Sequence, residues 1–223
     1  MTDPSANRVT ALYDTHSATW DRLRTRNGME CDWIDRFKHA MPSHPSTPHV
    51  LDLGSGTGQP LAAHLMDAGC KITGVDAAQA MTARAAARFP QQNWITADMR
   101  TLPPLGTFDG VLAWHSFFHL PPDAQRQMFA TFARLSHAGT ALMFTSGPES
   151  GETIGTFEGQ PLYHASLAPT EYRELLRAHG FRLLAHVAKD QSCGGATVWL
   201  AVMGSLNCDQ FATGLTLLQT TRI

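Results

Sequence analysis

The stretch Val50-Leu51-Asp52-Leu53-Gly54-Ser55-Gly56-Thr57-Gly58 decides the fold of this chain. Its first four residues are apolar apart from one acid, which is typical of a short strand buried on both faces. Three glycines at alternate positions then leave a turn almost without side chains, and Pro60 stands where a helix can begin. A ligand can lie against the main chain of such a turn, and the free N–H groups at a helix start favour a carboxylate or a phosphate. The stretch therefore predicts a strand, a turn and a helix that bind a nucleotide-like cofactor.

The spacing of the glycines separates this turn from the dinucleotide fingerprint. That fingerprint is G-x-G-x-x-G, whereas here the glycines are Gly54, Gly56 and Gly58. With Asp52 closing the strand, the pattern resembles the first motif of the class I S-adenosylmethionine-dependent methyltransferases. The resemblance covers residues 8–203. It implies an α/β fold with a doubly wound, seven-stranded, mostly parallel sheet whose last strand is antiparallel, and it implies S-adenosyl-L-methionine as the cofactor.

Two further strands end in acids. Lys71–Asp76 is a strand pattern, and its terminal carboxylate can accept hydrogen bonds from both hydroxyls of a ribose. Asn93–Arg100 contains the third strand, after which the resemblance assigns Asp98 to the adenine amino group and Met99 to the adenine ring. Asp76 can also be read as a helix cap. The residues predicted to bind cofactor are Tyr13, Trp20, Asp52, Gly54, Ser55, Gly56, Thr57, Gly58, Asp76, Ala77, Met81, Asp98, Met99, Trp114 and Ser116.

The fourth strand, Thr107–Trp114, should deliver the next residues to the crevice where ligands bind in doubly wound sheets. His115 and His119 follow it and are the candidate catalytic residues, since a histidine with a pKa near neutrality can remove a proton from a methyl acceptor. His119 is also a candidate acceptor contact. The alternative is that these histidines bond the backbone or hold the cofactor carboxylate. An Asn/Asp-Pro-Pro-aromatic segment, found here in nucleic-acid amino methyltransferases, is absent from the sequence.

The segment from Gly147 to Gly159 is long for a simple connection. It is interpreted either as a lid over the acceptor site or as a surface loop. Tyr163 and His164, which follow it, are predicted substrate contacts on that argument. Further along, Phe181–Ala188 and Gly195–Val202 read as strands separated by a connection too short for a parallel crossover, so they should pair antiparallel.

The N-terminal part reads as helical. Apolar residues at helical spacing predict one helix over 7–26 and a second over 29–41, followed by the proline-rich linker 42–48. The predicted organisation is a helical cap and linker over residues 1–48, a cofactor-binding core over 49–203 and an unassigned tail over 204–223. Two helices ahead of such a core resemble the cap of small-molecule methyltransferases.

Composition limits the remaining functions. The chain has 223 residues, 43% of them hydrophobic, and a net charge of −2, which offers nothing to attract nucleic acid. Arg22, Arg24 and Arg26 are interpreted as a solvated helix face. No signal peptide or membrane span is evident, so a cytoplasmic protein with reduced cysteines is expected.

The prediction is a methyltransferase that acts on a small-molecule acceptor, without a metal, a nucleic acid or a membrane partner, as a monomer or a homodimer. Asp76, Asp98 and Asp109 are accounted for by cofactor and strand-edge roles, which leaves no metal ligand set. Two alternatives stay open. One is a non-catalytic cofactor-binding module on the same fold, and the other is a nicotinamide-dependent oxidoreductase, which should instead show the dinucleotide glycine spacing.

Overall fold

A seven-stranded sheet organises the computed structural model, which describes residues 3–43 and 46–205. Across the sheet the strands are β3 (Asn93–Thr96), β2 (Lys71–Asp76), β1 (His49–Leu53), β4 (Phe108–Ala113), β5 (Ser136–Ser146), β9 (Ala196–Met203) and β8 (Phe181–Asp190). Strands β1 to β5 pair in parallel, whereas β9 is antiparallel to both of its neighbours. The predicted sheet and its antiparallel C-terminal pair are confirmed.

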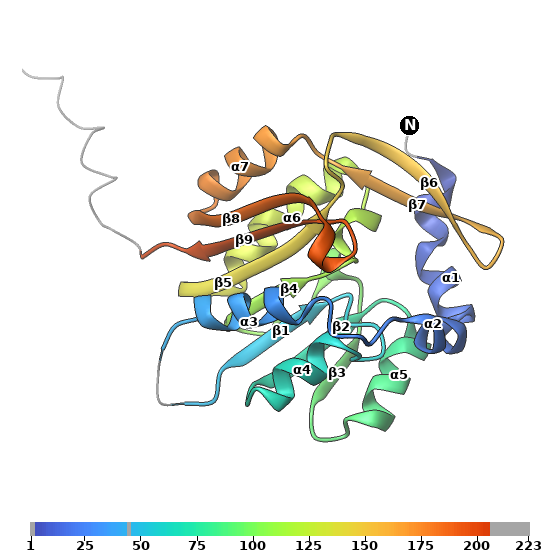
Figure 1. The fold of residues 1–223 in the computed structure, drawn as a ribbon, viewed down its shortest axis with the longest axis horizontal. Coiled ribbons are helices and arrows are strands. Elements are labelled where there is room, and N and C mark those ends of the chain that lie inside the picture. Colours follow the sequence, from blue (N-terminus) through green and yellow to red (C-terminus); the bar gives the residue numbers. More distant parts are fainter. Residues whose placement is uncertain (1–2, 44–45, 206–223) are drawn as a thin grey trace, which may run out of the picture.

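Helices cover both faces of this sheet (Figure 1). They are α3 (Cys31–Ala40), α4 (Leu61–Asp67), α5 (Gln79–Arg88), α6 (Pro122–Arg134) and α7 (Pro169–Ala178). Side chains alternate between two cores along each central strand: Val50 packs with α3 and α4, whereas Leu51 packs with α6 and α7. Burial on both faces explains why the central strands are nearly continuous apolar runs. Short 3-10 helices η1 (Pro4–Arg8), η2 (Met99–Thr101), η3 (Phe117–His119) and η4 (Gln191–Cys193) complete the fold.

The single helix expected over 7–26 is wrong in detail. The structure has η1, then α1 (Val9–Thr15) and α2 (Ser17–Leu23), with a break at His16, whose φ and ψ are −106° and 22°. Thr15 and Ser17 flank this break, and both residue types are mediocre helix formers. The break changes the direction of the chain, so that α1 and α2 together wrap one end of the sheet (Figure 1).

The segment expected to be a long loop forms a β-hairpin instead. Strands β6 (Gly151–Phe157) and β7 (Gln160–Ser166) pair antiparallel through a two-residue turn, in which Glu158 and Gly159 both have positive φ. Positive φ at both central residues is the type I′ geometry that joins hairpin strands. The hairpin lies beside η1 and α1 at the same end of the sheet (Figure 1).

Residues 206–223 of the unassigned tail, with Cys208, lie outside the described residues. Cys31, Cys70 and Cys193 are free thiols. Among residues 3–43 and 46–205, no helix has the length and apolar character to cross a membrane.

Candidate active site

The glycine turn after β1 has the geometry that the sequence predicts. Gly54, Gly56 and Gly58 have φ of 77°, 54° and 76°, a region that other residues rarely enter. A Cβ on Gly54 would lie 2.1 Å from the Cβ of Ser116, which follows β4. Glycine is therefore required both for the turn and for the close approach of two strand ends. The Ser116 hydroxyl donates to the carbonyl of Leu53 at 2.6 Å and fastens this contact.

A main cavity opens over this turn, with an empty volume of about 900 Å³, part of it open to solvent. Predicted residues that line it are Tyr13, Trp20, Gly54, Gly56, Asp76, Ala77, Met81, Asp98, Met99, His115, Ser116 and His119. The structure thus brings together, from several helices, strand ends and turns, most of the residues that the sequence singled out.

Asp76 stands at the end of β2 and anchors the turn. Its two carboxylate oxygens accept the N–H groups of Gly56 and Ala78, each at 2.9 Å. Burial raises the pKa of this carboxyl despite these hydrogen bonds. Each carboxylate oxygen retains a second lone pair, so Asp76 can accept two more hydrogen bonds from a ligand in the cavity.

Asp98 follows β3, the neighbour of β2 in the sheet, and lines the same cavity together with Met99. It caps η2 through the N–H of Arg100, and it also pairs with the Arg100 guanidinium at 2.5 Å. Burial would raise the pKa of Asp98, but the hydrogen bonds and charge of Arg100 outweigh burial and hold the pKa below its usual value. Arg100 lines the cavity as well, and the sequence analysis did not single it out.

A second cavity, of about 410 Å³ with its open part, adjoins the first beneath Trp20 and His115. Asp52 lines it and is 4% exposed, and no hydrogen bond from the described residues reaches its carboxylate. Burial, with a smaller contribution from the charge of Asp76, raises the pKa of Asp52 to about 7. The hydroxyl of Ser55 and the indole N–H of Trp114, in the wall of the same cavity, are buried without a partner in the described part of the chain.

Arg24 also lines the second cavity, so its interpretation as part of a solvated face is wrong. Its side chain is only 13% exposed and forms a 2.7 Å ion pair with Glu30, which is 2% exposed. Nothing in the local sequence distinguishes Arg24 from Arg22 or Arg26. Its burial depends on where the end of α2 meets the glycine turn, which is a tertiary contact.

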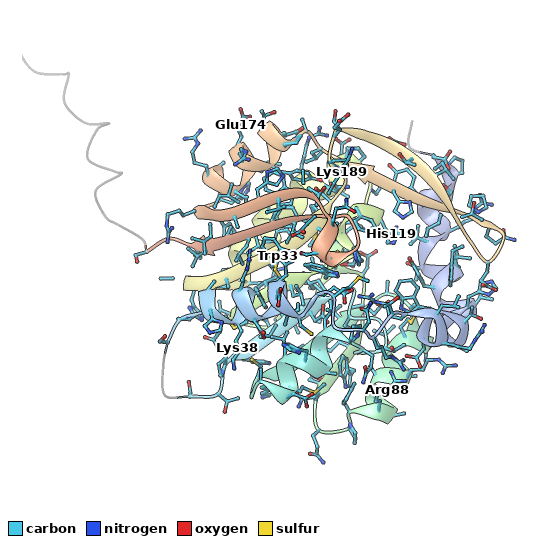
Figure 2. All side chains as sticks on the ribbon, in the orientation of Figure 1. Trp33, Lys38, Arg88, His119, Glu174 and Lys189 are labelled. Carbon is cyan, nitrogen blue, oxygen red and sulfur yellow. The ribbon has the colours of Figure 1, made fainter. Side chains whose placement is uncertain are left out.

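The two histidines differ in their surroundings. His119 Nδ1 lies 2.7 Å from the carbonyl oxygen of Tyr163, and Nε2 lies 3.0 Å from the Tyr13 hydroxyl. A carbonyl only accepts, so Nδ1 carries the proton and Nε2 accepts from Tyr13. Burial lowers the pKa of His119 to about 3, which keeps this ring neutral. Figure 2 shows His119 between the sheet and α1.

His115 has no such partners. Its backbone has a φ of 51° and is held by the N–H bond to the Thr145 hydroxyl at 2.8 Å, while no described group hydrogen-bonds its ring. Positive φ at a residue other than glycine costs about 1–3 kcal/mol and concentrates at functional sites. Burial, and then the charge of Arg24, lower the pKa of His115 to about 4. The ring lines both cavities.

Three predicted residues do not line either cavity. The Thr57 hydroxyl donates instead to Asp21 of α2 at 2.7 Å. The Tyr163 side chain is fully buried, and only its carbonyl serves the site by orienting His119. The His164 ring packs on His119, with centroids 4.8 Å apart. Four other predicted residues line the second cavity only: Asp52, Ser55, Gly58 and Trp114.

No group of three or more His, Cys, Asp or Glu side chains in the described residues is arranged to hold a metal ion.

Comparisons with known proteins agree with this geometry. Residues 50–139 match the family described as a methyltransferase domain. The O-methyltransferase resE of Aspergillus sclerotiorum is 26% identical over 208 residues, which are 81% of this chain and 78% of that protein. The fold is similar to that of the [4+2]-cyclase SpnF, with a TM-score of 0.70, 17% identity and coverage of 92% and 99% of the two chains.

A second solved structure has the same fold and contains S-adenosylhomocysteine, the form of S-adenosylmethionine that has lost its methyl group. It is the 1,6-didemethyltoxoflavin-N1-methyltransferase of Burkholderia thailandensis, crystallised with S-adenosylhomocysteine, with a TM-score of 0.67, 20% identity and coverage of 92% of each chain. The sequence match begins at the strand that precedes the glycine turn and includes β1 to β4. Residues 50–139 therefore match a methyltransferase domain, and the sheet order and glycine turn around them agree with those of class I S-adenosylmethionine-dependent methyltransferases.

Proposed function

We propose that this enzyme methylates an uncharged small molecule. The observation that carries the proposal is the set of polar side chains in the second cavity, of which Asp52, Ser55 and Trp114 have no hydrogen-bond partner among the described residues whereas Arg24 is paired with Glu30. The Asp52 carboxylate, the Arg24 guanidinium, the Ser55 hydroxyl and the Trp114 indole N–H complement the ammonium and carboxylate groups of an amino-acid end. S-adenosylmethionine has such an end, so these residues fit the cofactor.

The main cavity supplies groups for the remainder of the cofactor. We assign Asp76 to the ribose hydroxyls, because its carboxylate has free lone pairs beside the turn. Asp98 and Met99 are assigned to the adenine, with Met81 and Ala77 packing near it. S-adenosylmethionine, when bound, supplies a sulfonium methyl group that is open to in-line displacement by a nucleophile.

The charges near the site favour an uncharged acceptor. The charged side chains that line the two cavities are Arg24, Asp52, Asp76, Asp98 and Arg100. In the assignment above each of them has a partner in the protein or in the cofactor. A charged acceptor would lose its hydration without gaining a counter-charge, and this is costly in a buried site. Since resE is an O-methyltransferase, hydroxyl compounds are the first acceptors to test.

Two residues, His115 and Trp20, are expected to act on the acceptor by orienting it and by excluding water. The neutral His115 ring offers a free lone pair at the junction of the cavities. Its pKa of about 4 is lower than the near-neutral value expected of a general base, so the ring can orient the nucleophile and accept a proton only once methyl transfer has made that proton strongly acidic. Trp20 covers Gly56 and excludes water from the reaction.

We place the enzyme in the cytoplasm, acting on free metabolites rather than on nucleic acid, as a monomer or a homodimer. We also propose that residues 1–48 form a helical cap and linker and that residues 49–203 form the cofactor-binding core, with 204–223 as an unassigned tail.

Calorimetric titration with S-adenosylmethionine, S-adenosylhomocysteine and NAD tests the cofactor assignment, and it should also detect a proton. With a pKa of about 7, Asp52 is half protonated at pH 7 in the free protein. A bound ammonium group favours the carboxylate, so about half a proton should be released on binding at pH 7 and almost none at pH 8.5. The release is measured by repeating the titration in buffers of different ionisation enthalpy.

Asp52→Asn is the control for this measurement. It should bind the adenosyl ligands more weakly and lose the excess proton release, which separates Asp52 from the ligand's own amino group. Equal proton release in both proteins would contradict the role of Asp52. Binding of NAD in preference to the adenosyl ligands would contradict the cofactor. Binding without methylation of any acceptor in a hydroxyl, amine and thiol panel would favour the binding-module alternative.

His115→Asn should lower kcat by about a hundredfold while leaving the affinity for S-adenosylhomocysteine unchanged, because general acid–base groups contribute about 10²–10⁴-fold. His119→Asn should instead lower cofactor affinity and turnover together, since it loosens Tyr13 over the cavity. Turnover is followed by mass spectrometry with an acceptor from the panel. A larger kcat loss in the His119 variant than in the His115 variant would reverse these two roles.

A further inference from the structure

A row of polar contacts fastens the N-terminal cap, α1 and α2, to helix α5. On the cap the contacts come from both α1 and α2, and on α5 they come from residues one turn apart. The pairs are Asp14 with the N–H of Ala80 at 2.7 Å, Ser17 with Arg84 at 3.2 Å, and Asp21 with Arg88 at 2.7 Å. The cap is therefore held along three successive turns of α5.

Asp21 is the centre of this row, because it also reaches the glycine turn. It accepts the Thr57 hydroxyl at 2.7 Å, while Arg88 donates to both Asp21 oxygens and to the Thr57 carbonyl at 3.1 Å. Arg26 pairs with the same carboxylate from the outside at 2.9 Å. The hydrogen bonds of Arg88 lower the pKa of Asp21 to about 2, so it is ionised at neutral pH. Figure 2 shows Arg88 on α5, close to α2.

The residue before Asp21 is Trp20, which lines both cavities. Its indole nitrogen lies 3.6 Å from the position that a Cβ on Gly56 would take. Tyr13 and the hairpin residue Phe157 pack on the Trp20 ring, with centroids at 5.3 and 6.0 Å. The place of Trp20 over the turn is thus set on one side by aromatic contacts and on the other by Asp21.

We propose that Asp21 is a positioning residue that latches the cap to Thr57 and Arg88, and that opening of this latch limits the release of the cofactor. The inference rests on the proposed function, because the cofactor is assigned to the cavities that the cap covers. Trp20 lines both cavities, so a ligand bound there contacts the cap and should leave faster when the cap moves away from the glycine turn. The side chains of Asp21 and Arg88 are 16% and 30% exposed, so salt reaches this ion pair and weakens it only in part.

The test measures the dissociation rate of S-adenosylhomocysteine by stopped-flow displacement, with hydrogen exchange of the ligand-free protein as a second readout. Asp21→Asn should raise the dissociation rate about tenfold, which corresponds to about 1.4 kcal/mol. Exchange over residues 9–23 should accelerate in the same variant. Raising the salt concentration should speed dissociation from the wild type and have little effect on the variant.

Asp123→Asn is a surface control, because the Asp123 side chain is 91% exposed. Asp123 also pairs with an arginine, Arg126 at 2.7 Å, but it lies on α6 and lines neither cavity. This substitution should change neither rate. Thr57→Val removes only the hydroxyl contact and should raise the dissociation rate a few-fold, so it carries the test if Asp21→Asn does not fold.

The outcomes separate the latch from the proposed function. If Asp21→Asn lowers the melting temperature but leaves the dissociation and exchange rates unchanged, Asp21 only stabilises the fold. That result would overturn the proposal that it controls cofactor release. If the wild type does not bind S-adenosylhomocysteine, the cofactor assignment fails. The exchange rates of the ligand-free proteins then decide whether Asp21 holds the cap, and equal rates would overturn that as well.

Discussion

Gly54→Ala is expected to abolish cofactor binding and to lower the free energy of unfolding by about 2–5 kcal/mol. The new methyl group would lie 2.1 Å from the Ser116 Cβ, which is held by its own hydrogen bond to Leu53. It would also force an alanine to a φ of 77°. The ends of β1 and β4 must then separate, and both cavities change shape. Urea denaturation and titration with S-adenosylhomocysteine measure the two effects.

Gly106→Ala provides a control for the backbone part of this effect. Gly106 has the same φ of 77°, but a Cβ there meets nothing within 4 Å. The substitution should cost only about 1–2 kcal/mol and leave cofactor affinity unchanged. If the two variants lose equal stability, the close approach to Ser116 contributes nothing and the steric explanation fails.

Asp76→Asn should weaken binding of S-adenosylhomocysteine by about 1–3 kcal/mol, a factor of roughly 5–150, because ligand hydroxyls lose an ionised acceptor. The same change turns one acceptor of the glycine turn into a donor, facing either Gly56 N–H or Ala78 N–H. The loss therefore has a ribose part and a turn part, and calorimetry with one ligand measures only their sum.

A cofactor analogue without ribose hydroxyls separates the two parts. The 2′,3′-dideoxy analogue of S-adenosylhomocysteine should bind wild-type protein more weakly, and the Asp76→Asn variant should lose much less affinity for it than for the parent compound. Equal losses for both ligands would mean that Asp76 acts only through the turn. An unchanged dissociation constant for the parent compound would refute the ribose assignment.

The parts of the fold that could be predicted are those encoded locally. The strand before Gly54, the glycine turn and the acids at strand ends each form a short pattern, and the brief connection before Ala196 permits only a hairpin. The β6–β7 hairpin was missed because its polar residues give no clear apolar alternation. Its turn, Glu158-Gly159, is also a weaker signal than Asn-Gly or Asp-Gly. The break at His16 was missed because the apolar spacing continues across it.

The sequence by itself determined the order of the main elements, the glycine turn and the class of ligand, because these follow from periodicity and from residue types at neighbouring positions. Only the tertiary structure decided which groups became buried, paired or free. Asp52 acquires its raised pKa, Arg24 its place in a cavity wall and Asp21 its contacts with Thr57 and Arg88 from segments distant in the chain. Burial and charge pairing depend on such distant contacts, and a short local pattern contains no information about them.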